Sequence, residues 1–240
     1  MSRFVTIATW ANAPHLTPDM REKFLAKIPP HQRKARTEGI PHLGSGLVFP
    51  VAEEIIKIPD FPLPHHWKRC YAFDTGWNYN AAAWGAWDEE VDVVYIYKIY
   101  KREAAEPPIN AHAILSQGKW IPGVADAADV NRNDGRQWID IYRSLGLDIE
   151  LPDKAVETGI TEMWTRLSTG RLRVFESCTE WFEEYRVYSR NEKGILAKQN
   201  DHLMDSTRFM VLSGLRRAKH PPSKEKKLYD VYASPGSWMG

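Results

Sequence analysis

The sequence predicts an α/β fold built on one mixed sheet. Three β-type segments, residues 69–73, 81–87 and 93–100, follow one another across short turns, which is typical of an antiparallel meander. Shorter apolar strands at 121–125 and 172–175 then alternate with helical segments. Strands first, followed by alternating strands and helices, indicate a mixed sheet flanked by helices.

Helices are expected where apolar residues recur at helical spacing. Beyond the meander, the predicted helices are 108–117, 134–145, 155–168, 177–186 and 201–217. Trp84 and Trp87 alternate along the second strand, and we expect Trp84 to be the core residue of the two.

The first 68 residues have a different pattern. Nine of the sixteen prolines and five of the eight histidines lie there, which favours short elements joined by turns. Thr17 as N-cap and Pro18 at the first helical position predict a helix over about 18–28. A helical stretch, an edge strand and a stiff connector should follow, at 31–37, 47–51 and 62–66.

We expect three parts in the chain: a linker subdomain over 1–68, a main domain over 69–217 and a basic tail over 218–240. The basic residues of the tail begin at Arg216. Its composition is typical of a flexible, solvated terminus, with a contact to DNA or a partner protein as the alternative.

Composition excludes several classes of protein. Over 240 residues, 43% hydrophobic and 26% charged residues are ordinary globular values. The net charge of +1 excludes a histone-like DNA binder, and no apolar run approaches the ~18 residues of a membrane span. Two cysteines, Cys70 and Cys178, cannot form a disulfide scaffold or a four-cysteine zinc site, so we expect an intracellular, reducing setting.

Two apolar strands end on a carboxylate. Asp74 follows the segment 70–73, and Asp126 follows 122–125. Aspartate is depleted in strands, although each of these residues could simply open a turn or a polar loop. If the two strands are neighbours, both carboxylates converge on one edge of the sheet. Asp129, three residues after Asp126, is the alternative to it.

The start of the last predicted helix supplies a third acidic group. Asn200 can cap this helix, and Asp201 in its first turn suits the helix dipole. His202 and Asp205 lie on one helical face, and Asp201 and Asp205 are also one turn apart. Capping explains Asp201 but does not explain Asp205.

Separated aspartates of this kind suit Mg²⁺ or Mn²⁺, which prefer oxygen ligands. Two such ions ~4 Å apart can activate a water molecule and stabilise the leaving oxygen of a phosphodiester. Without metal, clustered carboxylates would repel one another and their pKa values would rise.

These motifs, taken in order, resemble the nuclease domain of the terminase large subunit of tailed bacteriophages. The resemblance is carried by Phe73-Asp74-Thr75-Gly76, by Val124-Ala125-Asp126 and by 200–202 with 205–209. It extends to 170–175, Glu180 and Tyr185, and to the opening segments 10–16, 33–46 and Phe49-Pro50, so that it covers residues ~4–215.

The resemblance implies a ribonuclease-H-like sheet, with three antiparallel strands followed by parallel ones. It implies a two-metal endonuclease that cuts concatemeric double-stranded viral DNA, with Mg²⁺ or Mn²⁺ as cofactor. Asp74, Asp126 and Asp205 would be catalytic metal ligands, with Asp201 as the alternative third ligand and His202 as a helper in positioning metal or water. The implied partners are an ATPase motor, portal and small terminase, in the cytoplasm of the host cell.

The chain departs from the family pattern in one respect. No Gly-x-x-x-x-Gly-Lys-Ser/Thr phosphate loop is present: Gly44-Ser45-Gly46 lacks the lysine, and Gly118-Lys119 lacks the following hydroxyl. We therefore expect a fragment of a longer protein, without DNA translocation driven by ATP.

Local cations must hold the DNA, because the net charge is near zero. The candidates are Arg132 and Arg136 beside Asp126, and Lys193 and Lys198 before the last helix, although each could be an ordinary surface charge. Two other functions remain open: another ribonuclease-H-like phosphodiesterase of resolvase or transposase type, and a non-catalytic docking module for portal or small terminase.

Overall fold

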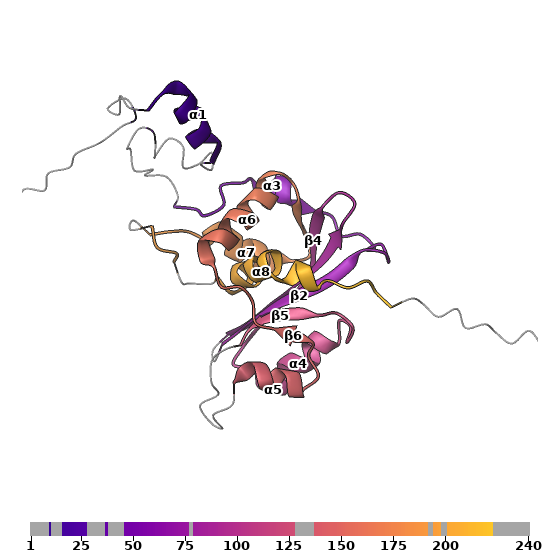
Figure 1. The fold of residues 1–240 in the computed structure, drawn as a ribbon. Coiled ribbons are helices and arrows are strands. Elements are labelled where there is room, and N and C mark those ends of the chain that lie inside the picture. Colours follow the sequence, from indigo (N-terminus) through magenta and orange to yellow (C-terminus); the bar gives the residue numbers. More distant parts are fainter. Residues whose placement is uncertain are drawn as a thin grey trace, which may run out of the picture.

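The computed structural model describes Trp10, residues 16–27, Thr37, and residues 46–76, 79–127, 137–191, 194–197 and 201–222. A seven-stranded mixed sheet lies at the centre of the described chain, in the order β1-β7-β4-β3-β2-β5-β6 (Figure 1). The strands are β1 (Lys57–Ile58), β2 (Lys68–Thr75), β3 (Tyr79–Asp88), β4 (Val93–Glu103), β5 (Gly123–Asp126), β6 (Ile149–Glu150) and β7 (Leu172–Phe175). No helix in these ranges is both long enough and apolar enough to cross a bilayer.

The strand directions confirm the predicted mixed sheet. The strands β2, β3 and β4 pair antiparallel, as the meander requires. The later strands add in parallel on both sides, with β5 beside β2 and β7 beside β4. Parallel pairs need crossover connections, which the helices between these strands supply.

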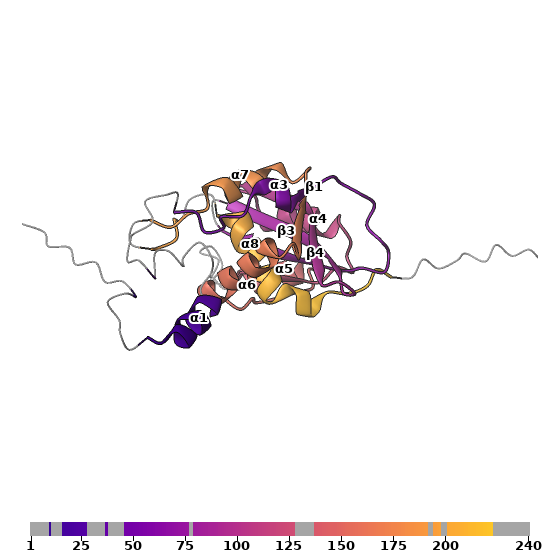
Figure 2. The same cartoon turned by 90° about the horizontal axis from the view of Figure 1, so that it is seen from above.

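Helices cover both faces of the sheet (Figures 1 and 2). The helices are α1 (Pro18–Lys27), α3 (Glu53–Ile56), α4 (Pro107–Leu115), α5 (Trp138–Ser144), α6 (Val156–Ser168), α7 (Thr179–Val187) and α8 (His202–Leu212), followed by a 3₁₀ turn at Gly214–Arg217. Apolar residues of α6, α7 and α8 pack on one face, and those of α4 and α5 on the other. Figure 1 shows α1 standing apart from these layers.

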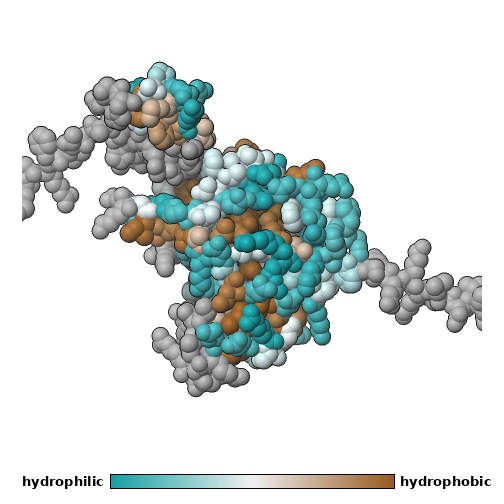
Figure 3. Space-filling model, viewed as in Figure 1, coloured by the Kyte–Doolittle hydropathy of each residue, from teal (hydrophilic) through white to brown (hydrophobic). Residues whose placement is uncertain are grey.

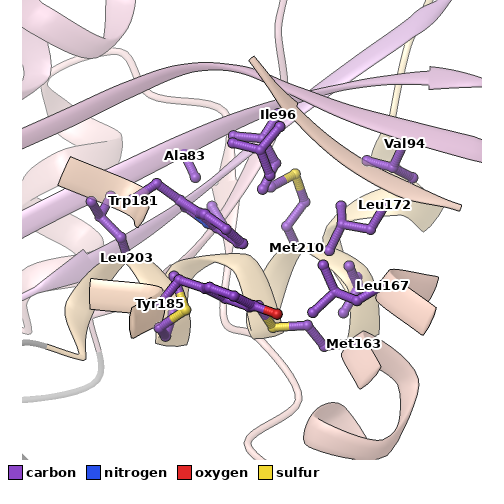
Figure 4. Close-up of a cluster of buried hydrophobic side chains, with 14 of the residues drawn as sticks. Ala83, Val94, Ile96, Met163, Leu167, Leu172, Trp181, Tyr185, Leu203 and Met210 are labelled. Atoms are coloured by element: carbon purple, nitrogen blue, oxygen red, sulfur yellow. The ribbon is translucent and has the colours of Figure 1, made fainter. Parts of the chain in front are cut away.

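The core under α6, α7 and α8 explains why these helices lie so close to the sheet. Met163, Trp181, Leu203 and Met210 belong to the same core cluster as Ala83 of the central strand β3 (Figure 4). A Cβ atom at Gly85 would lie 2.4 Å from the Met210 sulfur, so any larger residue here would displace the Met210 side chain. The close packing of α8 on β2 and β3 fixes where the start of α8 lies.

Trp84 is confirmed as the core residue of its pair. Its side chain is 1% exposed and packs on the α4 and α5 face, beside the ring of Tyr71. Trp87 is half-buried at the end of the strand, where its indole N–H donates to Asp92.

The segment that precedes β2 packs against the sheet and its helices more closely than the predicted linker subdomain implies. The predicted edge strand at 47–51 is wrong: Leu47 makes one isolated bridge with Ser189, and Phe49 is buried against the rings of Tyr185 and Tyr188. A short helix, α3, and the two-residue strand β1 follow, and β1 pairs in parallel with β7. Residues 31–36 of the predicted second helix lie outside the described residues.

The last helix is shorter than predicted, and the segment after it is held against the sheet. The α-helix ends at Leu212, and the chain continues as the 3₁₀ turn. The Arg69 and Lys219 backbones exchange two hydrogen bonds, and the Lys219 ammonium pairs with Asp148 at 2.9 Å. The described start of the predicted tail is thus anchored through the backbone of Lys219, whose side chain remains exposed, and residues 223–240 lie outside the described part.

Hydrophilic residues cover much of the face seen in Figure 3, with apolar residues exposed between them. The exposed large apolar side chains include Met20 and Phe24 of α1 and Val187 at the end of α7.

Candidate active site

The site is built on the edge where β2 and β5 end. Asp74 and Asp126 are direct partners in the parallel register of these strands. Ala72 and Val124, two residues before each aspartate, belong to the core under α8. Because side chains alternate along a strand, both carboxylates lie on the α8 side of the sheet.

Helix α8 brings a histidine to this edge. The His202 Nδ1 atom lies 2.9 Å from the Asp74 Oδ2 atom. The imidazole also stacks on the Tyr79 ring at a centroid distance of 5.1 Å, which orients its plane. The Asp74 carboxylate raises the pKa of His202 by accepting this hydrogen bond.

Asp205 lies one turn into α8 and is held by Arg208. Both Nε and one terminal nitrogen of the Arg208 guanidinium donate to Asp205 Oδ1, at 3.1 and 3.0 Å. Burial raises the pKa of Asp205 to about 6; Arg208 opposes this shift, whereas the charges of Asp201 and Asp74 add to it.

Asp126 faces a cation that the sequence analysis missed. The Lys154 ammonium lies 2.6 Å from Asp126 Oδ1, and this side chain is half exposed. Lys154 stands in the segment between β6 and α6, and no local pattern distinguishes it from other surface lysines.

The electrostatics of Asp74 indicate crowded carboxylates. Burial raises its pKa; His202 counteracts this effect, whereas the charges of Asp126 and Asp201 raise the pKa further. Asp201 occupies the N-cap position of α8 but makes no capping hydrogen bond with its side chain. The charge of Asp201 also raises the pKa of Asp205, so that Asp201 belongs electrostatically to this group of acids.

The structure thus brings together Asp74, Asp126, Asp205, His202 and Asp201, which come from three elements. The other predicted site residues, Asp129, Arg132, Arg136, Lys193 and Lys198, lie outside the described residues, as does Asn200.

The donor set suits a hard divalent cation, since its acidic members offer carboxylate oxygens. Within the described ranges, no three His, Cys, Asp or Glu side chains already stand at metal-ligand spacing. Asp126 and Asp205 are instead paired with Lys154 and Arg208. A metal ion shared with Asp74 would compete with these two cations for the carboxylates of Asp126 and Asp205.

Glu184 is a further acidic residue near this edge that the sequence analysis missed. Its carboxylate is buried between α7 and the start of α8, where it accepts hydrogen bonds from backbone N–H groups. A single glutamate in an amphipathic helix gives no sequence signal for such a contact.

Curated relatives carry the same kind of sequence over nearly the whole chain. The chain is 35% identical to the terminase large subunit of Enterobacteria phage LP7 over 90% of its length, and 36% identical to that of Salmonella phage P22 over 95%. It spans about half the length of these relatives, 48% of each.

Solved structures share the fold. The P22 large terminase nuclease domain matches with a TM-score of 0.67 and 31% identity, over 74% of this chain and 96% of that domain. The magnesium-bound nuclease domain of the large terminase from thermophilic phage G20c matches with a TM-score of 0.51 and 14% identity, over 68% and 95%. The Mn-bound SPP1 large terminase nuclease domain matches with a TM-score of 0.50 and 16% identity, over 66% and 96%.

The family model of the terminase RNaseH-like domain matches residues 71–213, which contain every acidic residue of the site described above. Together with the P22 relatives, this match shows that the chain belongs to the terminase RNaseH-like family.

Proposed function

We propose that this chain is the metal-dependent endonuclease part of a viral DNA-packaging terminase, and that it cuts concatemeric double-stranded DNA into genome lengths. The main support for the proposal is the paired position of Asp74 and Asp126 at one sheet edge, with His202 of α8 hydrogen-bonded to Asp74. Membership of the terminase family supports the biological setting.

We further propose Asp74, Asp126 and Asp205 as metal ligands, with Asp201 as the alternative to Asp205. The nuclease domains from G20c and SPP1 hold magnesium and manganese, ions that prefer the oxygen donors of this site. Two bound ions would supply an activated water and stabilise the leaving oxygen of the phosphodiester.

The chain's own residues have separate roles in this proposal. His202 holds one oxygen of Asp74 by a hydrogen bond, so that the other oxygen could bind a metal ion. Lys154 lies beside Asp126, where it can pair with a DNA phosphate once that carboxylate has turned away. Arg208 restrains Asp205 from within α8.

In the complete protein we propose that an ATPase motor, portal and small terminase work with this nuclease, at the procapsid in the host cytoplasm. The lengths of the relatives, about twice that of this chain, leave room for such a motor. A resolvase-like or transposase-like phosphodiesterase and a docking module are the alternatives.

Supercoiled plasmid incubated with Mg²⁺, Mn²⁺ or EDTA tests the proposal. We expect nicking and linearisation by the wild type with either metal, none in EDTA, and none with Asp74→Ala. Glu90→Ala is the matched control, since it removes an exposed acid from the turn at the opposite edge of the sheet. Equal cleavage by wild type and Asp74→Ala would place the active site elsewhere, and metal-independent partner binding without cleavage would favour docking.

A further inference from the structure

Helix α8 carries two residues of the proposed site, yet its own sequence does not cap it. Asp201 stands at the N-cap position without a side-chain capping bond. The first N–H groups of a helix have no acceptor within the helix and need one from elsewhere.

Glu184 of α7 supplies that acceptor. Its Oε2 atom accepts hydrogen bonds from the Leu203 N–H at 2.6 Å and from the Met204 N–H at 3.3 Å. Its Oε1 atom accepts from the Lys101 ammonium of β4 at 2.8 Å. The Glu184 side chain is 1% exposed, and a buried carboxylate is tolerated only when it is paired and hydrogen-bonded in this way.

The capped turn is the one that faces the site. Leu203 and Met204 lie between His202, which bonds to Asp74, and Asp205. The Glu184 carboxylate therefore links α7 and β4 to the first turn of α8, whose position relative to β2 determines where His202 and Asp205 lie. A negative charge at this helix end is also favoured by the helix dipole.

We propose that Glu184 is a positioning residue of the nuclease site: by capping α8 from α7, it holds His202 and Asp205 in register with Asp74 and Asp126. The inference rests on the proposed function. Among the described residues, the Glu184 carboxylate is hydrogen-bonded to Lys101 and to the backbone of α8, and it acts through that backbone.

A second buried contact between α7 and α8 provides a matched control. The Trp181 indole N–H donates to the Thr207 hydroxyl at 2.9 Å, one turn deeper in α8 (Figure 4 shows Trp181 in the core). Thr207→Val removes this buried bond between the same two helices and the bond from the Thr207 hydroxyl to the Leu203 carbonyl, but leaves the Leu203 and Met204 N–H groups bonded to Glu184. Its loss of thermal stability should resemble that of Glu184→Gln.

The experiment measures Mn²⁺ binding by calorimetry without DNA, and hydrogen exchange of single amides, in the wild type, Glu184→Gln and Thr207→Val. For Glu184→Gln we expect Mn²⁺ affinity to fall by roughly tenfold or more, the scale found when groups that orient metal ligands are removed. Exchange at Leu203 and Met204 should accelerate, and kcat should fall while KM for DNA stays constant. Thr207→Val should keep wild-type affinity and first-turn protection.

Wild-type Mn²⁺ affinity in Glu184→Gln, or an equal loss in both variants, would overturn the positioning role. If Glu184→Gln does not fold, hydrogen exchange in the wild type tests the cap. Protected Leu203 and Met204 amides would support it. Amides that exchange as freely as uncapped first-turn amides would contradict it. A wild-type protein that binds no Mn²⁺ would overturn the proposed function instead. The exchange data would then test only whether Glu184 caps α8.

Discussion

Asp74 and Asp126 are partners in the parallel ladder between β2 and β5, so that two carboxylates project side by side from one sheet edge. Like charges this close are destabilising unless a cation compensates them. The pKa of Asp74 is raised by its burial and further by the charge of Asp126. The site is thus arranged to gain stability from a bound divalent ion.

Mn²⁺ should stabilise the wild type and fail to stabilise Asp74→Asn. A ligand at one hundred times its Kd stabilises a folded protein by about 2.7 kcal/mol, which corresponds to roughly 5–10 °C in Tm for a domain of this size. Thermal unfolding with Mn²⁺ and with EDTA measures the difference. Glu90→Gln should respond to Mn²⁺ like the wild type, and an equal Tm increase in Asp74→Asn would remove Asp74 from the metal site.

Asp205 should make the metal-free protein less stable as the pH rises from about 4 to 6. Burial raises its pKa to about 6, so the folded state binds this proton more tightly than the unfolded state, and the stabilisation is lost as the pH passes the folded-state pKa. Asp205→Asn removes this loss and should gain up to about 3 kcal/mol at pH 7, less whatever the Arg208 contact contributes, and nothing at pH 4.

Urea unfolding of the wild type and Asp205→Asn in EDTA, at pH 4 and pH 7, measures that difference. Asp140→Asn is the control, because it changes an exposed carboxylate in the first turn of α5. A gain for Asp205→Asn that is the same at both pH values would contradict the raised pKa.

The sequence predicts the centre of this fold because the central strands are long enough to show a period. The segments 69–73, 81–87 and 93–100 all form strands, and the ends of two apolar runs at Asp74 and Asp126 meet as expected. Alternation alone determines the face on which these carboxylates lie.

The peripheral elements could not be predicted in this way. Two residues, as in β1 or β6, are too few to carry a period, and β1 exists because β7 offers it a parallel partner. The apolar residues around Phe49 predict a strand, but Phe49 is buried by stacking on Tyr185 and Tyr188. The contacts of Glu184 and Lys154 join segments far apart in the chain, where sequence spacing carries no information.

Trp84→Ala should destabilise the protein by about 3–5 kcal/mol, the usual cost of removing a fully buried large aromatic side chain. The ring is enclosed on the α4 and α5 face of the sheet, where the neighbouring elements cannot collapse into the space. Urea unfolding measures the loss. Val187→Ala, at an exposed site on α7, should change the free energy of unfolding by less than about 0.5 kcal/mol. An unchanged midpoint for Trp84→Ala would contradict the described burial.

Lys154→Met should separate metal binding from DNA binding. The Lys154 ammonium lies 2.6 Å from Asp126 and competes with a metal ion for that carboxylate. Because exposed ion pairs contribute about 0.2–1 kcal/mol, the variant should bind Mn²⁺ up to about fivefold more tightly. KM for DNA should rise and depend less steeply on salt, since one cation that can pair with phosphate is gone.

Calorimetry with Mn²⁺ and cleavage kinetics at several salt concentrations measure the two effects of Lys154→Met. Lys119→Met is the control: Lys119 precedes β5, at the opposite end of that strand from Asp126, so its removal should leave the Mn²⁺ affinity unchanged. Weaker Mn²⁺ binding by Lys154→Met would mean that Lys154 supports the metal site rather than competing with it. An unchanged salt dependence would mean that Lys154 does not contact the DNA backbone.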